Sequence, residues 1–111
     1  MANYNGKELY VGAKSFIFEF EIRTVIEMDN NNIVLLSIPF NDSTINNIYC
    51  IDEFANVKWR VQDLNEISKG NNLPYEQMQI SNGKIYASDF YGRCFIIDAY
   101  TGIIEGKKIV K

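Results

Sequence analysis

The chain has 111 residues, a formal net charge of −3, 47% hydrophobic and 23% charged residues, which are ordinary values for one soluble globular domain. It contains no histidine, so the commonest general base and metal ligand are missing, and no nucleophile elbow, phosphate-binding glycine loop or zinc-ligand pair is present. We therefore expect no enzyme, cofactor or metal, and a cytoplasmic location, because the sequence has neither a secretory signal pattern nor an apolar run of about 20 residues.

Strand patterns follow one another along almost the whole chain. The pattern predicts an N-terminal hairpin over 7–21. Phe16, Phe18 and Phe20 alternate with other residues within SFIFEFEIRTVIEM (15–28), which indicates strand rather than helix. Eight further strands are predicted in two units, at 22–28, 32–39, 47–52 and 57–61, then at 76–80, 84–90, 93–98 and 103–110. Between the units, Asp63 can cap a single helical turn over 64–68. The expected class is all-β, in one domain that spans residues 1–111.

The two units read as copies of one repeat. YCIDEFANVKW (49–59) aligns with FIIDAYTGIIE (95–105) at a spacing of 46, and IVLL (33–36) aligns with KIYA (84–87) at a spacing of 51. The difference, 51 − 46 = 5, predicts an insertion in the NDSTIN loop (41–46) of the first copy. Repeats of roughly 40–50 residues with four strands each are typical of propeller blades.

The repeated aspartates, Asp52 and Asp98, are predicted to form turns rather than to catalyse a reaction. An aspartate at the start of a short hairpin loop accepts hydrogen bonds from backbone N–H groups across the turn. The fifth residue, Asn56 or Gly102, is expected to supply the left-handed conformation that closes the turn.

Three further side chains are expected in the core. Cys50 and Cys94 lie in apolar strand patterns, where a reduced cysteine behaves as a small hydrophobic residue; a disulfide or a reactive thiol is the alternative. Trp59 follows the first aspartate turn and is expected to pack between sheets, with a surface anchor as the alternative.

The two copies resemble the blade repeat of the pyrroloquinoline-quinone-type β-propellers, whose blades end in an Asp-x-x-x-Gly turn before a strand that often carries Trp. The resemblance covers residues 22–61, as a first blade, and 76–111, as a second, although Glu105 stands where the first copy has Trp59. It implies blade architecture but no quinone, because the ligand pattern is absent. Closed propellers need at least about four blades. The predicted fold is therefore an open half β-propeller of about two and a half four-stranded antiparallel blades.

A stand-alone half-propeller of this length resembles the small immunity proteins of contact-dependent growth inhibition systems. The resemblance implies a cytosolic protein that binds one cognate toxin domain, commonly a nuclease such as a ribonuclease, and blocks its active site. Between Ser15 and Val57 there are seven acidic residues and one base, Arg23, so this segment nets 1 − 7 = −6. Such a charge complements a basic nuclease cleft and disfavours direct nucleic-acid binding. A merely solvated acidic face is the alternative.

Acidic and aromatic side chains in loops are the expected toxin contacts, because aromatic anchors ringed by charge concentrate binding energy. The candidates are Asp29, Phe40, Asp42, Glu53, Phe54, Tyr91 and Tyr100. For Phe40 and Phe54 the alternative is that they cover the rim of the core. A second hypothesis for function is an assembly module that oligomerises through open sheet edges. A small-ligand sensor or enzyme is a third, for which no constellation of residues is present.

Overall fold

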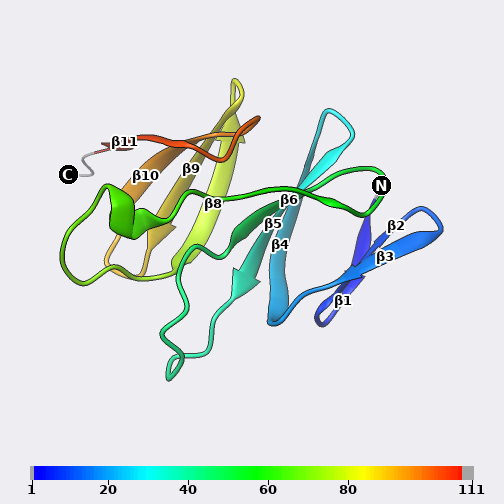
Figure 1. Ribbon diagram of the computed structural model, residues 1–111, viewed down its shortest axis with the longest axis horizontal. Helices are drawn as coiled ribbons and strands as arrows, with labels where there is room; N and C mark the ends of the chain where they lie inside the picture. Colours follow the sequence, from blue (N-terminus) through cyan, green and yellow to red (C-terminus); the bar gives the residue numbers. More distant parts are fainter. Residues whose placement is uncertain (1, 109–111) are drawn as a thin grey trace.

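The computed structural model describes residues 2–108 and contains eleven strands and one 3₁₀ helix. The strands form three antiparallel sheets that lie side by side along the long axis of the molecule (Figure 1), and the described strands close no barrel. The all-β prediction is confirmed. The end of the last predicted strand, 109–110, lies outside the described residues.

The first sheet differs from the predicted N-terminal hairpin. It has three strands, which are β1 (Asn3–Asn5), β2 (Glu8–Val11) and β3 (Lys14–Ile17). We call it the N-terminal sheet. Its first turn is the two-residue loop Gly6–Lys7 between the paired residues Asn5 and Glu8, with Gly6 at a φ of 60°, and the hairpin prediction over 7–21 missed it.

The run over 15–28 forms strands, as predicted, and it is divided between two sheets. Residues 18–20 leave the N-terminal sheet and lead into the next one. Phe18 is 5% exposed, and its ring lies 4.8 Å from that of Phe16 and 5.3 Å from that of Tyr49. The alternation of aromatic residues therefore continues through the connection at 18–20, because the residues before and after this connection pack against the same core.

The two other sheets are four-stranded meanders, as predicted. The central sheet contains β4 (Glu21–Met28), β5 (Asn31–Ser37), β6 (Ile48–Ile51) and β7 (Val57–Arg60). The C-terminal sheet contains β8 (Tyr75–Ser81), β9 (Lys84–Asp89), β10 (Cys94–Asp98) and β11 (Ile104–Lys108). The predicted helical turn is the 3₁₀ helix η1 (Leu64–Glu66), which Asp63 caps by accepting a 3.1 Å hydrogen bond from the Asn65 N–H.

The central and C-terminal sheets repeat each other in detail. A bulge interrupts the pairing of β4 at Arg23 and the pairing of β8 at Glu76, and these positions are 53 residues apart. The turns that follow, 29–30 and 82–83, have the same spacing, and all four residues have positive φ, as in a type I′ hairpin.

The register corrects the predicted length of the inserted loop. Ile33 pairs with Cys50 and Tyr86 pairs with Ile96, so β5 and β9 are 53 residues apart whereas β6 and β10 are 46 apart. The insertion is therefore 53 − 46 = 7 residues and not five. The predicted spacing of 51 differs by two residues, a shift that keeps every side chain on the same face of a strand, so the apolar pattern could not detect it.

The core has two layers because the central sheet is buried on both faces. All of residues 32–36 in β5 are buried, whereas β9 alternates between buried and partly exposed positions. One cluster joins the central sheet to the C-terminal sheet, and the other joins it to the N-terminal sheet. The outer face of the C-terminal sheet is mostly polar, and carries Gln77, Gln79, Ser81, Tyr86 and Ser88.

Trp59 packs between the sheets, as predicted. It is 9% exposed, and its ring lies against Gly102, where an added Cβ would stand 2.6 Å from the Trp59 Cε3 atom. The counterpart of Trp59 in the second copy is Gly106 rather than Glu105, because Trp59 pairs with Cys50 while Gly106 pairs with Ile96. The turn after β10 is one residue longer than the turn after β6, which shifts the alignment by one residue.

Both cysteines are core residues with free thiols, as predicted. Cys50 is 1% exposed and Cys94 is 8% exposed. Burial raises the pKa of the Cys50 thiol to about 11 and also raises the pKa of Cys94. Because a thiolate is the reactive form, these shifts favour the less reactive thiol form of both cysteines at neutral pH.

Asp52 and Asp98 form turns, as predicted. The Asp52 Oδ1 atom accepts hydrogen bonds of 2.9 Å from the N–H groups of Phe54 and Asn56. The Asp98 Oδ1 atom accepts one of 2.8 Å from the N–H of Tyr100. Both carboxylates are therefore engaged by the backbone.

The left-handed residue was predicted correctly in only one of these turns. Gly102 has a φ of 77°, but in the first turn the left-handed residue is Ala55, with a φ of 64°, and not Asn56. The first turn closes one residue earlier, when the Asp52 N–H donates to the Asn56 carbonyl, so the reversal of the chain falls on the residue before Asn56.

A third aspartate turn joins β9 to β10 and was not predicted. The Asp89 Oδ1 atom accepts from the N–H groups of Tyr91 and Arg93 at 2.9 and 3.0 Å, and its Oδ2 atom accepts from Arg93 Nε at 2.7 Å. Gly92, with a φ of 81°, takes the place that Ala55 has in the first turn. DFYGR (89–93) therefore forms the same turn as DEFAN (52–56), and their shared aspartate was the sequence signal.

We expect Asp98→Ala to lower the free energy of unfolding by about 0.5–2 kcal/mol, the usual range for losing a side-chain cap on backbone donors. Asp89→Ala should cost more, since Asp89 is 5% exposed and accepts three hydrogen bonds. Thermal unfolding of both variants measures the order. An unchanged melting temperature for Asp98→Ala together with a lost activity would instead indicate a chemical role for this carboxylate.

Candidate functional site

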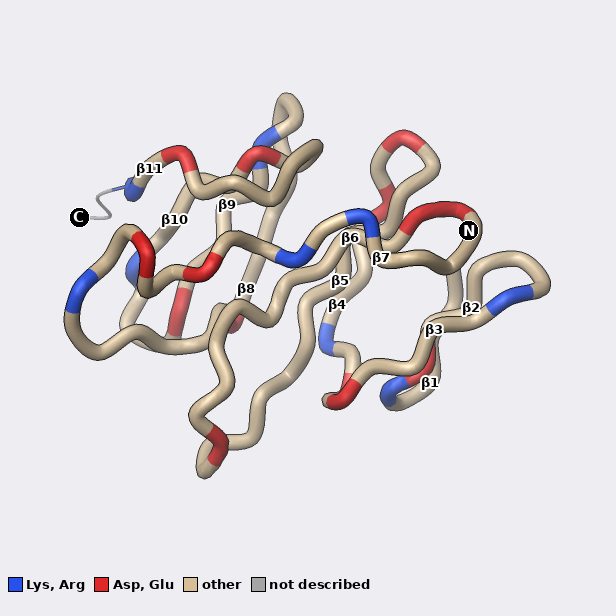
Figure 2. The backbone as a smooth tube through the Cα atoms, viewed as in Figure 1, with Lys and Arg blue, Asp and Glu red and all other residues tan. Residues whose placement is uncertain are grey.

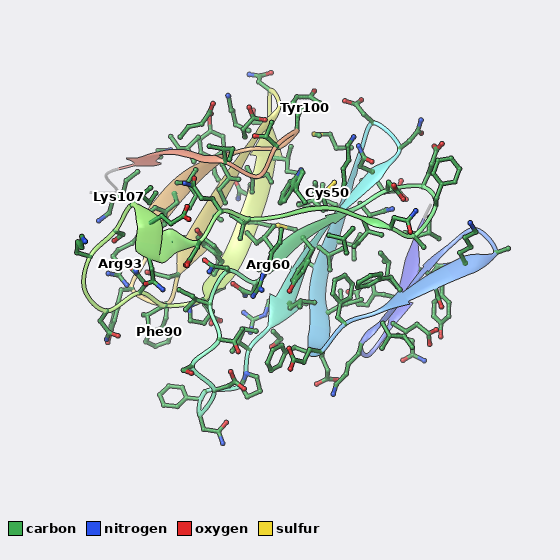
Figure 3. All side chains as sticks on the ribbon, in the orientation of Figure 1. Cys50, Arg60, Phe90, Arg93, Tyr100 and Lys107 are labelled. Carbon is green, nitrogen blue, oxygen red and sulfur yellow. The ribbon has the colours of Figure 1, made fainter. Side chains whose placement is uncertain are left out.

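A groove of about 450 Å³ opens where one end of the central sheet meets the C-terminal sheet. Its walls come from the loop after β5, the chain that leads into β8, and the turn between β9 and β10. We call it the aromatic groove; it is lined by Arg23, Ile38, Pro39, Phe40, Asp42, Leu73, Pro74, Glu76, Phe90 and Tyr91. Figure 3 labels Phe90 at this end of the C-terminal sheet.

The rim of the groove consists of exposed aromatic side chains. Phe40 is 103% exposed, Phe90 75% and Tyr91 71%. The rings of Phe90 and Tyr91 meet edge to face at 5.7 Å, and the Arg93 guanidinium lies 5.8 Å from the Tyr91 ring centre. The alternative that Phe40 covers the rim of the core is wrong, because its ring contacts almost nothing. Three exposed aromatic residues beside one hollow are typical of a binding surface.

The floor of the groove holds an ion pair between the two repeats. Arg23 Nη1 donates to Glu76 Oε1 at 2.7 Å and to the Glu76 carbonyl at 3.0 Å, and Arg23 Nη2 donates to Ser37 Oγ at 3.2 Å. Both charged residues stand at the equivalent bulges of β4 and β8, and a bulge re-aims the side chain that it carries. The pair leaves the floor with no net charge.

Asp42 adds an unbalanced negative charge to the groove. Its Oδ1 atom accepts a 2.8 Å hydrogen bond from the Thr44 N–H. Hydrogen bonds from the Thr44 side chain and backbone hold the pKa of Asp42 below its usual value, so this carboxylate is ionised at neutral pH. Among the described residues no ion pair joins Asp42 to a base.

The inserted loop that carries Phe40 and Asp42 is fixed at its base. Arg60 Nε donates to the Asn46 carbonyl at 2.9 Å, and Arg60 Nη2 donates to the Ile45 carbonyl at 3.1 Å. The guanidinium also lies 5.2 Å from the centre of the Tyr49 ring. Figure 3 labels Arg60 beside this loop. An anchored base limits the conformational entropy that the loop would lose on binding a partner.

Asn47 joins the two walls of the groove, a role that no local sequence signal indicated. It is 1% exposed, and its Nδ2 atom donates to the carbonyls of Leu36 and Tyr75 at 2.8 and 2.9 Å. Its Oδ1 atom accepts from the Tyr75 N–H at 2.8 Å. One amide therefore fixes the start of β8 against the end of β5.

The other four predicted contacts lie at the opposite end of the sheets, which we call the far end. Asp29 and Glu53 line a separate hollow of about 290 Å³. The Tyr100 hydroxyl donates to Asp29 Oδ2 at 3.3 Å, and the Asp29 carboxylate raises the pKa of Tyr100. Phe54 is 58% exposed, and the Lys14 ammonium lies 5.9 Å from its ring centre.

The seven predicted contacts therefore do not form one surface. The groove brings together Phe40, Asp42 and Tyr91, and it adds Phe90, which was not predicted. The far end is separated from it by the length of β5, whose seven residues span roughly 20 Å. A strand separates the loops at its two ends, so residues on either side of β6 that are close in sequence, such as Asp42 and Glu53, lie at opposite ends of the sheet, and sequence proximity failed here.

The acidic segment of the sequence is divided in the same way. Glu21 begins β4 and Glu19 lies two residues before it, on the side of the groove, whereas Glu27, Asp29 and Glu53 stand at the far end. Figure 2 shows acidic segments at both ends of the central sheet. The acidic residues of 15–57 therefore do not lie together on one face.

These features define a class of protein: an all-β chain of three antiparallel sheets with an aromatic groove between two repeated sheets. The family model for a domain of unknown function (DUF7957) matches residues 1–109, and the chain belongs to this family. No curated protein and no solved structure matches the chain.

Two searches of the described residues bear on other kinds of site. Within 2–108, no group of three or more His, Cys, Asp or Glu side chains is placed to hold a metal ion. In the same part of the chain, no helix has the length and apolar character needed to cross a membrane.

Proposed function

We propose that this chain is an immunity protein of a toxin–immunity system, which binds a nuclease toxin in the cytoplasm and blocks its active site. A ribonuclease is the expected kind of toxin, and the aromatic groove is the surface that would contact it. The observation that carries the proposal is the set of exposed aromatic side chains, Phe40, Phe90 and Tyr91, around one anchored hollow. An open half β-propeller is part of the same proposal.

The half-propeller arrangement is supported by the agreement between the central and C-terminal sheets. They share strand order, the bulge at position 23 or 76, and the type I′ turn at 29–30 or 82–83. They also pack face to face, as neighbouring blades do, around one apolar cluster. The three-stranded N-terminal sheet would be the partial third blade.

A binding role is favoured because the aromatic side chains at the rim of the groove are exposed to water, which costs free energy. When a partner covers exposed aromatic side chains, the complex is stabilised by about 25 cal/mol for each Å² of apolar surface buried. Aromatic residues at the centre of an interface are the usual hot spots. Phe40 stands on a seven-residue insertion that the second copy lacks, so the repeat itself does not need this side chain.

The alternative, an assembly module that pairs open sheet edges, receives less support. The edge strand β7 carries Lys58 and Arg60, and the edge strand β11 carries Lys107 and Lys108. Basic residues on an edge strand are a common device against edge-to-edge pairing. The outer face of the C-terminal sheet is also polar, which disfavours stacking of a further sheet upon it.

Charge reversals at the two ends of the molecule test the proposal. We expect Asp42→Lys to slow association with the nuclease toxin domain encoded beside this gene, because the wild-type carboxylate attracts a basic cleft. The matched reversal at the far end, Glu53→Lys, should leave association unchanged. Phe40→Ala should act on dissociation, by about 2 kcal/mol, or roughly 30-fold. Surface-immobilised kinetics at low and high salt measure all three.

The opposite results would be equally informative. If Glu53→Lys slows association and Asp42→Lys does not, the interface lies at the far end. If the wild-type protein neither binds the toxin domain nor protects cells that express it, the immunity proposal fails. The assembly module would then be tested by the solution mass of the purified protein.

A further inference from the structure

We propose that the aromatic groove takes a basic side chain of the partner, an arginine or lysine flanked by apolar residues. Its charged head would lie at Asp42 and its stem along Phe40 and Tyr91. This inference rests on the proposed function, because it names the chemistry of the segment that the same groove would receive.

The charges that line the groove favour a cation. Three charged residues line it, and two of them, Arg23 and Glu76, neutralise each other through a 2.7 Å ion pair. Asp42 is left as the unbalanced charge, and it is ionised. Glu21 adds a second negative charge nearby, because the register places it opposite Ser37, which directly precedes Ile38 of the groove wall.

The aromatic side chains favour the same occupant. A guanidinium or ammonium group over an aromatic face is stabilised by about 0.5–1 kcal/mol at an exposed site. Phe40, Phe90 and Tyr91 offer such faces to a partner, and Arg93 already lies 5.8 Å from the centre of the Tyr91 ring. Arg93 does not satisfy Asp42, since its own ion pair is with Asp89 at 2.7 Å.

Other occupants fit less well. An acidic segment would be repelled by Asp42 and Glu21. A wholly apolar segment would cover the Asp42 carboxylate without supplying a partner, and a buried unpaired charge is costly. A long basic side chain avoids both costs, because its methylene stem covers apolar surface while its head stays with the carboxylate.

Short peptides test this chemistry without the toxin. The probes are acetyl-Leu-Arg-Leu-amide, its citrulline analogue, which has the same shape without the charge, and acetyl-Leu-Glu-Leu-amide. Titration is followed by backbone N–H chemical shifts of the full-length protein. We expect the arginine peptide to shift the signals of residues 40–44 and 90–92, the citrulline peptide to bind about two- to five-fold more weakly, and the glutamate peptide to leave the signals unchanged.

Matched variants show whether the named residues are responsible. Asp42→Asn should weaken the arginine peptide by about two- to five-fold and abolish its advantage over citrulline, whereas Glu53→Gln at the far end should change nothing. Phe40→Ala should weaken all peptides that bind, while Phe54→Ala should not. Shifts confined to the far end, equal binding of the arginine and citrulline peptides, or binding of neither would overturn the inference.

The two proposals can fail separately. If toxin binding depends on Phe40 but the groove shows no preference for arginine over citrulline, the groove is the interface and its occupant is not basic. If the arginine peptide binds with the expected preference but the toxin domain does not bind, the groove chemistry stands and the immunity function fails.

Discussion

Gly102→Ala is expected to lower the free energy of unfolding by about 2–5 kcal/mol. Two separate costs add at this position. Gly102 has a φ of 77°, a left-handed conformation that costs a residue with a Cβ about 1–2 kcal/mol. The added Cβ would also stand 2.6 Å from Cε3 and 2.8 Å from Cδ2 of Trp59, and such overpacking costs about 1–3 kcal/mol more.

Trp59 has little freedom to move away from that Cβ. It belongs to the cluster between the central and C-terminal sheets, and the chain on both sides of the contact is fixed. The Gln62 N–H donates to the Gly102 carbonyl at 2.9 Å, and the Gln62 Oε1 atom accepts from the Ile104 N–H at 2.9 Å. The clash must therefore move one sheet relative to the other.

Gly92→Ala is the matched control. Gly92 has a similar φ, 81°, but an added Cβ there would meet no atom within 4 Å. Ala55 already occupies the equivalent place in the first turn with a φ of 64°, so alanine is compatible with this turn. We expect only the conformational cost, about 1–2 kcal/mol. Chemical denaturation measures both variants, and equal effects would contradict a specific clash with Trp59.

The strands and turns of this chain could be predicted because their causes are local. Alternation of apolar residues marks each strand, and the aspartates at positions 52 and 98 mark turns through hydrogen bonds to their own neighbours. Even the burial of Trp59 follows from its place in a strand beside the turn. These features depend on interactions between residues that are close in sequence, within one hairpin, and the same pattern occurs in both copies of the repeat.

The site was less predictable because it depends on which ends of the strands meet. A shift of two residues in register leaves the apolar pattern unchanged, so the pattern could not give the true length of the insertion that carries Phe40. Tyr91 and Asp42 are brought to one groove by packing between sheets, while Glu53 is taken to the far end by the turn after β6. Loop chemistry identified candidates but not their grouping.

Asn47→Ala is expected to lower the free energy of unfolding by about 2–4 kcal/mol, because it removes three hydrogen bonds in a buried place. The carbonyl of Leu36 and both backbone groups of Tyr75 would lose the partner that the Asn47 amide supplies. Asn32→Ala is the matched control. Asn32 is also buried, at 4% exposed, but makes a single long hydrogen bond, 3.4 Å, to the Ile51 carbonyl. Its replacement should cost about 1 kcal/mol.

The Asn47 variant also tests whether the groove depends on the hydrogen bonds by which the Asn47 amide joins its two walls. Tyr75 directly follows Leu73 and Pro74 of one wall, and Leu36 lies two residues before Ile38 of the other. Without the amide, these walls are expected to separate, so the Tyr75 N–H should exchange faster with solvent and partner binding should fall even where the protein stays folded. Hydrogen exchange and binding, both measured well below the melting temperature, follow these effects. An Asn47→Ala protein within 1 kcal/mol of the wild type, with a protected Tyr75 N–H, would show that apolar packing alone holds the two walls together.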